Sequence, residues 1–184
     1  MGPGDIVTHA FTGFNPGGLV GDGGRVLPGA LDARRRGVRF DVGHGAGSFA
    51  WATAEAALAD GFLPDTISTD LHRFNIASPV GDLPATMSKL LHLGVPLDDV
   101  VAMVTSAAVA SLGPARAGLG RLAIGDEADL TVLGIEEERR LLLDAKGVGR
   151  EVDRHLVPAA VLRGGVRVAV EPRVTVAPAG IAPG

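Results

Sequence analysis

Two histidines and one aspartate stand at the ends of three short apolar runs. The runs cover residues 5–9, 39–44 and 66–70, and they end at His9, His44 and Asp70. A neutral imidazole is a good ligand for Zn²⁺, and a carboxylate can bind a metal ion or take a proton from an attacking water. Catalytic groups in a parallel barrel project from the carboxyl ends of several strands, so these three side chains are predicted to share one site.

Each of these residues also has a structural interpretation. His9 alone could be a buried, hydrogen-bonded histidine, and Asp70 could cap the next segment. The convergence of three strand ends favours a functional role for both, and Asp70 is further supported by the polar neighbours Ser68, Thr69 and His72. His44 stays open between contacting a substrate and hydrogen-bonding the backbone.

The remaining histidines are expected to have other roles. His92 falls in a predicted helix and His155 in a predicted β region, where packing or surface roles are far commoner than chemistry. The triple Arg34-Arg35-Arg36 is expected to be the solvated last turn of a helix that ends at Gly37.

The turn after the second run is rich in glycine. Residues 43–48 read Gly-His-Gly-Ala-Gly-Ser and could cradle a phosphate, although the complete Walker and dinucleotide fingerprints are absent. Ser48 is predicted to cap a helix that continues to about Ala59. The chain contains no Gly-x-Ser-x-Gly elbow, which argues against a serine hydrolase.

The elements around these residues indicate an α/β fold followed by a β module. Helices are predicted over residues 31–36, 48–59, 82–93 and 96–113, and strand-like runs follow at 129–133, 140–143, 156–162 and 166–170. The β module is predicted to begin near Leu119. A Gly-rich stretch from Gly13 to Gly29 is long enough to suggest a functional loop.

Composition excludes several classes of protein. The chain has 184 residues, 46% of them hydrophobic, and a formal net charge of −4 without a long basic block, so neither nucleic acid nor a membrane surface is expected as a partner. No cysteine is present, and no apolar run reaches the roughly 18 residues of a membrane span. A cytoplasmic protein is expected.

Five stretches together resemble the amidohydrolase superfamily. The branch is that of the amidohydrolase/deacetylase family metallohydrolases, similar to dihydroorotase, and the likeness runs from about Gly4 to Val168. The matching stretches are Gly4–His9, Phe40–Phe49, Gly61–His72, Asp82–Lys89 and Gly125–Leu130.

The resemblance implies a fold and a chemistry. The fold would be the C-terminal part of a metal-dependent (β/α)₈ TIM barrel, strands six to eight, in residues 1–118, then a β-sandwich portion in residues 119–176 and a loose tail in residues 177–184. His9 would be a ligand of one or two divalent metal ions, most often Zn²⁺. Asp70 would be both a ligand and the general base for hydrolysis of an acyl ester or cyclic amide.

The sequence also departs from that family. The family's His-x-His motif, its carboxylated lysine and its strand-five histidine are missing, and Lys89 and Lys146 are the two lysines present. This implies a truncated gene product, a late start codon or one half of a split protein. The alternative to a deacetylase-like enzyme with a small-molecule substrate is therefore a non-catalytic remnant that needs a complementing chain or a homo-oligomer.

Overall fold

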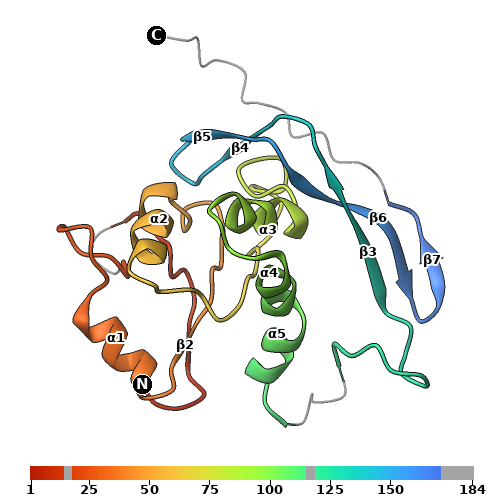
Figure 1. Cartoon of the computed structure of the whole chain (residues 1–184), viewed down its shortest axis with the longest axis horizontal. Coiled ribbons are helices and arrows are strands. Elements are labelled where there is room, and N and C mark those ends of the chain that lie inside the picture. Colours follow the sequence, from red (N-terminus) through yellow and green to blue (C-terminus); the bar gives the residue numbers. More distant parts are fainter. Residues whose placement is uncertain (15–17, 115–118, 171–184) are drawn as a thin grey trace.

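The protein has a mixed α/β architecture, as predicted. The computed structural model describes residues 1–14, 18–114 and 119–170. In chain order the elements are β1 (Ile6–Val7), α1 (Pro28–Arg35), β2 (Arg39–Phe40), α2 (Trp51–Ala59), α3 (Leu83–His92), α4 (Leu97–Val104), α5 (Ser106–Ser111), β3 (Leu130–Glu136), β4 (Arg140–Leu143), β5 (Gly149–Val152), β6 (His155–Arg163) and β7 (Val166–Val168). In Figure 1 the helices α3, α4 and α5 lie between the α1–α2 region and the long strands of the C-terminal part.

The three apolar runs lie side by side in parallel. β1 pairs with β2 through Ile6 and Arg39, and an isolated parallel bridge joins Asp41 to Thr66. The regular strands are shorter than predicted, and the third run is a bridge rather than a named strand. Their order in space nevertheless follows the chain, so the three carboxyl ends meet at one edge.

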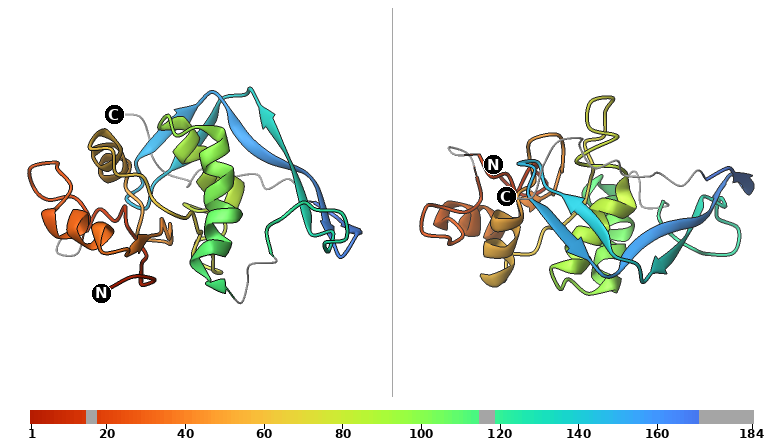
Figure 2. Two further views of the ribbon diagram at one scale, coloured as in Figure 1. Left: turned by 60° about the horizontal axis from the view of Figure 1, so that its bottom comes forward. Right: turned by 90° about the horizontal axis from the view of Figure 1, so that it is seen from above.

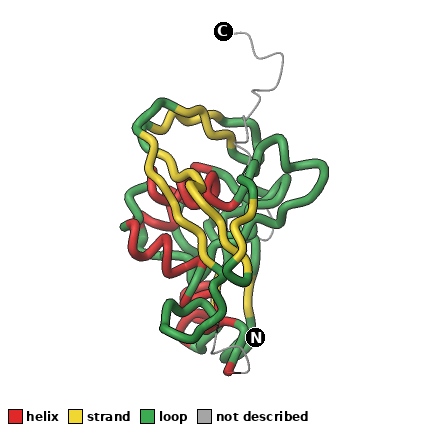
Figure 3. Tube along the Cα trace, turned by 90° about the vertical axis from the view of Figure 1, so that its right-hand side faces the viewer, coloured by secondary structure: helices red, strands yellow, loops and turns green. Residues whose placement is uncertain are grey.

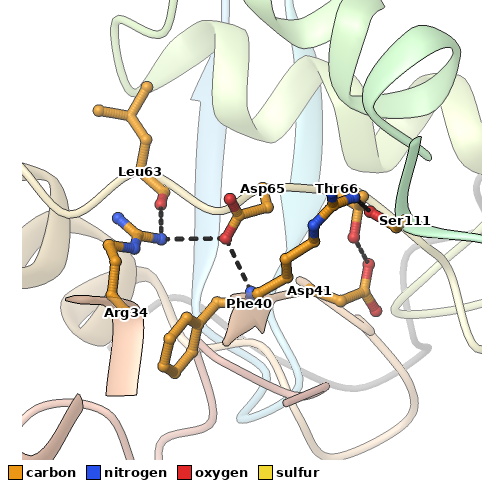
Figure 4. A network of polar contacts seen from close by, with 8 residues as sticks. Arg34, Phe40, Asp41, Leu63, Asp65, Thr66 and Ser111 are labelled. Atoms are coloured by element: carbon orange, nitrogen blue, oxygen red, sulfur yellow. Dashed lines mark hydrogen bonds and ion pairs between the residues drawn. The ribbon is translucent and has the colours of Figure 1, made fainter. Parts of the chain in front are cut away.

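A polar network at the opposite end of these runs ties them to α1 (Figure 4). The Arg34 guanidinium donates to the Leu63 carbonyl and, at 3.3 Å, to Asp65, whose carboxylate accepts the Phe40 N–H at 2.8 Å. Arg34 also stacks 3.6 Å over the ring centroid of Phe62, and burial lowers its pKa. The expectation that Arg34 is simply a solvated helix end is therefore wrong.

α2 begins later than predicted. Its N-cap residue is Ala50, and the Ser48 N–H donates instead to the His44 carbonyl, 3.1 Å away, in the preceding turn. The N–H of Trp51 is satisfied by the Asp144 carboxylate at 3.1 Å. A residue distant in sequence thus caps this helix, which local patterns could not reveal.

The helical segment after residue 96 is divided. α3 begins where a helix was predicted, and Asp82 is its N-cap, accepting the Ala85 N–H at 2.8 Å. The single helix expected over 96–113 is instead α4 and α5, because Thr105 leaves the helical region with φ −125° and ψ −97°. Its hydroxyl donates to the Val101 carbonyl at 2.7 Å, a side-chain bond that commonly bends helices.

The C-terminal strands form an antiparallel sheet in the order β3-β6-β7. β3 runs along β6 from the pair Leu130–Leu162 to the pair Glu136–His155. The pairing has a bulge beside Pro158, which is a position where a strand tolerates a proline without an N–H. Figure 3 shows this sheet from its exposed side, with helices behind it. A complete sandwich stays a prediction.

A second hairpin, β4–β5, joins the C-terminal strands to the rest of the molecule (Figure 2). β5 was not predicted. Its Val152, together with Leu142 and Leu156, belongs to the same hydrophobic core as Phe49, and the Trp51 indole donates to the Val148 carbonyl at 3.0 Å. One core therefore crosses the predicted domain boundary near residue 118.

Two further expectations meet the structure only in part. The predicted tail, residues 177–184, and the last part of the predicted 119–176 unit lie outside the described residues. In the described ranges no helix is long and apolar enough to cross a membrane.

Candidate functional site

Hydrogen bonds also join the three parallel runs beyond the residues of their short ladders. They bring the carboxyl ends of the runs together at one edge. The Ala10 N–H donates to the Asp41 carbonyl at 3.0 Å, and the Gly45 N–H donates to the Thr69 carbonyl at 3.0 Å. His9, the 43–45 turn and Asp70 are consequently neighbours, as their positions at three parallel ends predicted.

His9 is held in one orientation. Its backbone is left-handed, with φ 62°, which is uncommon for a residue with a side chain. Its Nδ1 lies 2.7 Å from the Gly43 carbonyl oxygen. A carbonyl can only accept, so Nδ1 donates, and in the neutral ring the lone pair is then on Nε2. This is how metal-binding histidines are commonly oriented.

Asp70 is the second residue with a left-handed backbone, at φ 47°. Its side chain is exposed, and its carboxylate has no hydrogen bond or ion pair with any of the described residues. Its carbonyl accepts from the Asn75 amide at 2.8 Å, and the Asn75 side chain in turn accepts the His72 N–H at 2.8 Å. The backbone is fixed while the carboxylate is left available.

Two glycines seat both side chains. Gly43 and Gly45 have φ 46° and 53°, so each is in the conformation that side chains rarely adopt. A Cβ at Gly43 would meet the Thr8 hydroxyl and lie 2.9 Å from His9 Nδ1, and one at Gly45 would lie 2.8 Å from Asp70 Oδ2. His9 and Asp70 therefore rest on the same turn.

A buried carboxylate underlies this edge. Asp41 is only 7% exposed and accepts three hydroxyl hydrogen bonds, from Thr8 at 2.9 Å, Thr66 at 2.7 Å and Ser68 at 2.6 Å. Those hydroxyls come from both neighbouring runs. Asp41 was not among the predicted site residues, although a charged residue inside the apolar run Phe40-Asp41-Val42 was a usable signal.

His44 faces the interior rather than the site. It is fully buried, its ring stacks on Phe49 with centroids 4.9 Å apart, and its Nε2 lies 2.5 Å from Lys89 Nζ. Nδ1 lies 2.9 Å from the Gly45 carbonyl oxygen. Of the two roles left open for His44, backbone hydrogen bonding is the one observed in the structure. Burial, together with the nearby charge of Lys89, lowers the pKa of His44 to about 3.

The other candidates lie away from this edge. His92 is in α3 with its ring 5.9 Å from Trp51, and His155 pairs with Glu136 at 3.1 Å on β6. Three N–H groups of the Gly43–Ser48 turn, those of His44, Gly45 and Ser48, donate to protein carbonyls and are not available to a phosphate. The phosphate hypothesis therefore loses part of its support.

The described residues supply only part of a metal site. Nowhere in residues 1–14, 18–114 and 119–170 do three His, Cys, Asp or Glu side chains come together in a way that could hold an ion. His9 Nε2 and the Asp70 carboxylate have suitable donor chemistry, but a zinc site usually needs three protein ligands or four. The pair fits a metal as part of a larger ligand set.

Comparison with known proteins gives these residues a family. No family model matches the chain. It is 37% identical over 171 residues to a deacetylase of Agrobacterium fabrum, covering 92% of this chain and 41% of that protein. It is also 37% identical over 160 residues to a deacetylase of Brucella anthropi, covering 86% of this chain and 39% of that protein. The chain thus spans less than half the length of these curated relatives.

Solved structures agree with the sequence relatives. The chain superposes on an adenine deaminase with TM-score 0.85 and 34% identity, covering 91% of this chain and 45% of that one. A dihydroorotase gives TM-score 0.82 and 36% identity, covering 92% of this chain and 45% of that one. The chain belongs to the amidohydrolase superfamily. The predicted family resemblance is confirmed, and the relatives named deacetylase, adenine deaminase and dihydroorotase support the coarser prediction of a hydrolase family.

Proposed function

We propose that this amidohydrolase-superfamily chain carries part of a metal-dependent hydrolase site, with His9 and Asp70 as two of its ligands. The supporting observation is that both residues adopt left-handed backbones and rest on the same glycine turn. Such strained conformations cost on the order of 1–3 kcal/mol each and cluster at functional sites. Two of them at adjacent strand ends favour a shared chemical role.

The parallel runs support a barrel as the frame of this site. β1, β2 and the run around Thr66 are adjacent, parallel and in chain order, as consecutive strands of a (β/α)₈ barrel are. We infer that residues outside this chain complete both the barrel and the ligand set, either from a longer polypeptide or from a complementing chain. Barrels avoid open sheet edges by closing.

The proposed reaction is hydrolysis of an acyl ester or a cyclic amide. When bound, a divalent metal ion such as Zn²⁺ supplies Lewis acidity to the reacting carbonyl and water. The exposed Asp70 carboxylate accepts a proton as water attacks the acyl carbon, and it returns that proton to the leaving oxygen or nitrogen as the carbon–heteroatom bond breaks. His9 contributes its Nε2 lone pair and is kept in that tautomer by Gly43.

The decisive variant is Asp70→Asn, which removes the base and the negative charge without changing size. Zn²⁺ titration calorimetry and turnover of a chromogenic acetyl ester and a cyclic amide are the measurements, made on the longer polypeptide or on the chain together with its complementing chain. We expect at least a 100-fold loss of turnover and weaker Zn²⁺ binding, with the far-ultraviolet dichroism unchanged. Asp153→Asn is the matched control, because that side chain is 84% exposed at the surface. Undiminished turnover in folded Asp70→Asn would contradict the proposal.

The alternative function is a non-catalytic remnant, favoured by the incomplete ligand set. It predicts weak metal binding by the isolated chain and no turnover under any metal. Tight, stoichiometric Zn²⁺ binding by the monomeric chain would exclude it.

A further inference from the structure

A lysine with no exposed surface lies behind the site. Lys89 of α3 is 0% exposed, and its ammonium reaches three acceptors: His44 Nε2 at 2.5 Å, the Leu143 carbonyl at 2.7 Å and the Pro79 carbonyl at 3.0 Å. An ammonium has three N–H donors, and all three are used. Lysine is almost never fully buried unless it is paired in this way.

The lysine determines which nitrogen of His44 carries the proton. A protonated Lys89 can only donate, so His44 Nε2 must accept. The imidazole proton then sits on Nδ1, which donates to the Gly45 carbonyl at 2.9 Å. Stacking on Phe49, at an interplanar angle of 9°, fixes the plane of the ring.

His44 in turn holds the turn that seats the two proposed ligands. Its N–H donates to the Ser68 carbonyl at 3.1 Å, which anchors the residue between Gly43 and Gly45. Gly43 orients the His9 ring through its carbonyl, and Gly45 lies so close to Asp70 that an added Cβ would be 2.8 Å from Asp70 Oδ2. Lys89 is therefore linked through His44 and the two adjoining glycines to both His9 and Asp70.

Burying the Lys89 ammonium in the core costs free energy. Burying an ammonium carries a desolvation penalty of several kcal/mol, and apolar residues of similar volume are often at least as stabilising. Packing alone does not account for a lysine at this position, whereas a requirement for directional hydrogen bonds does.

We propose that Lys89 and His44 are positioning residues that, through the Gly43–Gly45 turn, set the tautomer of His9 and the placement of Asp70. This inference rests on the proposed function for the identity of the two ligands. Neither positioning residue contacts the substrate or the metal. Their effect is expected in the orientation and affinity of the ligands rather than in the chemistry itself.

The test compares His44→Phe with His92→Phe in the 184-residue chain. Phenylalanine keeps the stack on Phe49 but accepts nothing from Lys89, and His92 lies on α3 without a hydrogen bond to the turn. Nitrogen-15 NMR reads the tautomer of His9 at pH 8, where an ordinary imidazole is neutral, and that of His44 at pH 6, and calorimetry measures Zn²⁺ affinity. In His44→Phe we expect His9 to change from the pure Nδ1–H form to a tautomer mixture and Zn²⁺ affinity to fall about tenfold, the lower end of second-sphere effects. His92→Phe should leave both within about twofold of wild type.

Three results separate the possible failures. An unchanged His9 tautomer in folded His44→Phe overturns the positioning role. A wild-type His44 that carries its proton on Nε2 at pH 6 also overturns it, and this measurement needs no variant, so it decides the matter even if His44→Phe does not fold. Absence of Zn²⁺ binding by wild type together with a changed His9 tautomer in His44→Phe contradicts the proposed function but supports the positioning role.

Discussion

At the scale of single residues, the site depends on backbone conformations that side chains usually avoid. His9 and Asp70 have positive φ, and so do the two glycines between which they are seated. His9 and Asp70 differ from the two glycines in what keeps the backbone in this conformation. The two proposed ligands are held in the left-handed region by neighbouring hydrogen bonds, whereas Gly43 and Gly45 have no room for a Cβ. The glycines are therefore part of the site without doing chemistry.

Gly45→Ala tests this distinction. The new methyl group would lie 2.8 Å from Asp70 Oδ2, and residue 45 would keep a φ of 53°. We expect a loss of roughly 1–2 kcal/mol in the free energy of unfolding from the left-handed alanine, together with about a tenfold or greater loss of Zn²⁺ affinity from displacement of Asp70. Urea unfolding and calorimetry measure the two effects.

Gly61→Ala is the matched control for that variant. Gly61 has φ 72° with nothing within 4 Å of an added Cβ, so the backbone cost is similar and the steric contact is missing. It should lose stability but keep its Zn²⁺ affinity. Equal affinity losses in both variants would show that the contact with Asp70 does not matter.

At the scale of elements, local chemistry predicted most helices, and long-range contacts explain two of the features that it missed. Asp82 before a proline-containing turn identified α3, and Gly37 identified the end of α1, because caps and left-handed glycines act within a few residues. The start of α2 was misplaced because its first N–H is satisfied by Asp144, 93 residues away. Lys89 was passed over for the same reason, since two of its three acceptors, on His44 and Leu143, lie 45 and 54 residues away.

Ser88 shows how one hydroxyl joins two elements. It donates to the Pro84 carbonyl within α3 at 2.7 Å and accepts the Leu156 N–H of β6 at 2.8 Å, and both Ser88 and Leu156 are buried. Ser88→Ala would leave that N–H without its partner, so the free energy of unfolding should fall by about 1–3 kcal/mol. Ser106→Ala, on the exposed surface of α5, is the control and should change it by less than about 0.5 kcal/mol. Chemical denaturation that finds both variants equal would refute the link.

At the scale of the whole molecule, one core unites segments that the sequence separates. The aromatic residues Phe49 and Trp51 pack with Leu142 and Val152 from the β4–β5 hairpin, and Lys89 donates to the carbonyl of Leu143. The family could be predicted because its motifs are contiguous in sequence. The buried Lys89, which joins the two predicted units, could not be predicted in this way. Because it is buried beside His44, the stability of the whole chain is expected to depend on pH.

The acid side of that dependence is assigned to His44. Its pKa is lowered to about 3 in the folded chain, mainly by burial and then by the charge of Lys89, against 6.5 for an ordinary histidine. Between these values the unfolded chain binds more protons, so the stabilisation is complete above pH 6.5 and is lost as pH falls towards 3. Burial lowers the pKa of Lys89 from 10.5 to about 7. Its contribution to the free energy of unfolding therefore also decreases as the pH falls, in the range between these two values.

The expected outcome is a free energy of unfolding that falls by up to about 1 kcal/mol per pH unit on account of His44 between pH 6 and pH 4. Carboxylates also titrate in this range, so the slope of wild type alone does not isolate the histidine. The difference between His44→Phe and His92→Phe does, because both variants keep every carboxylate. Urea unfolding at half-unit steps should show a shallower acid slope in His44→Phe only, and parallel slopes in the two variants would mean that His44 is not held neutral by the fold.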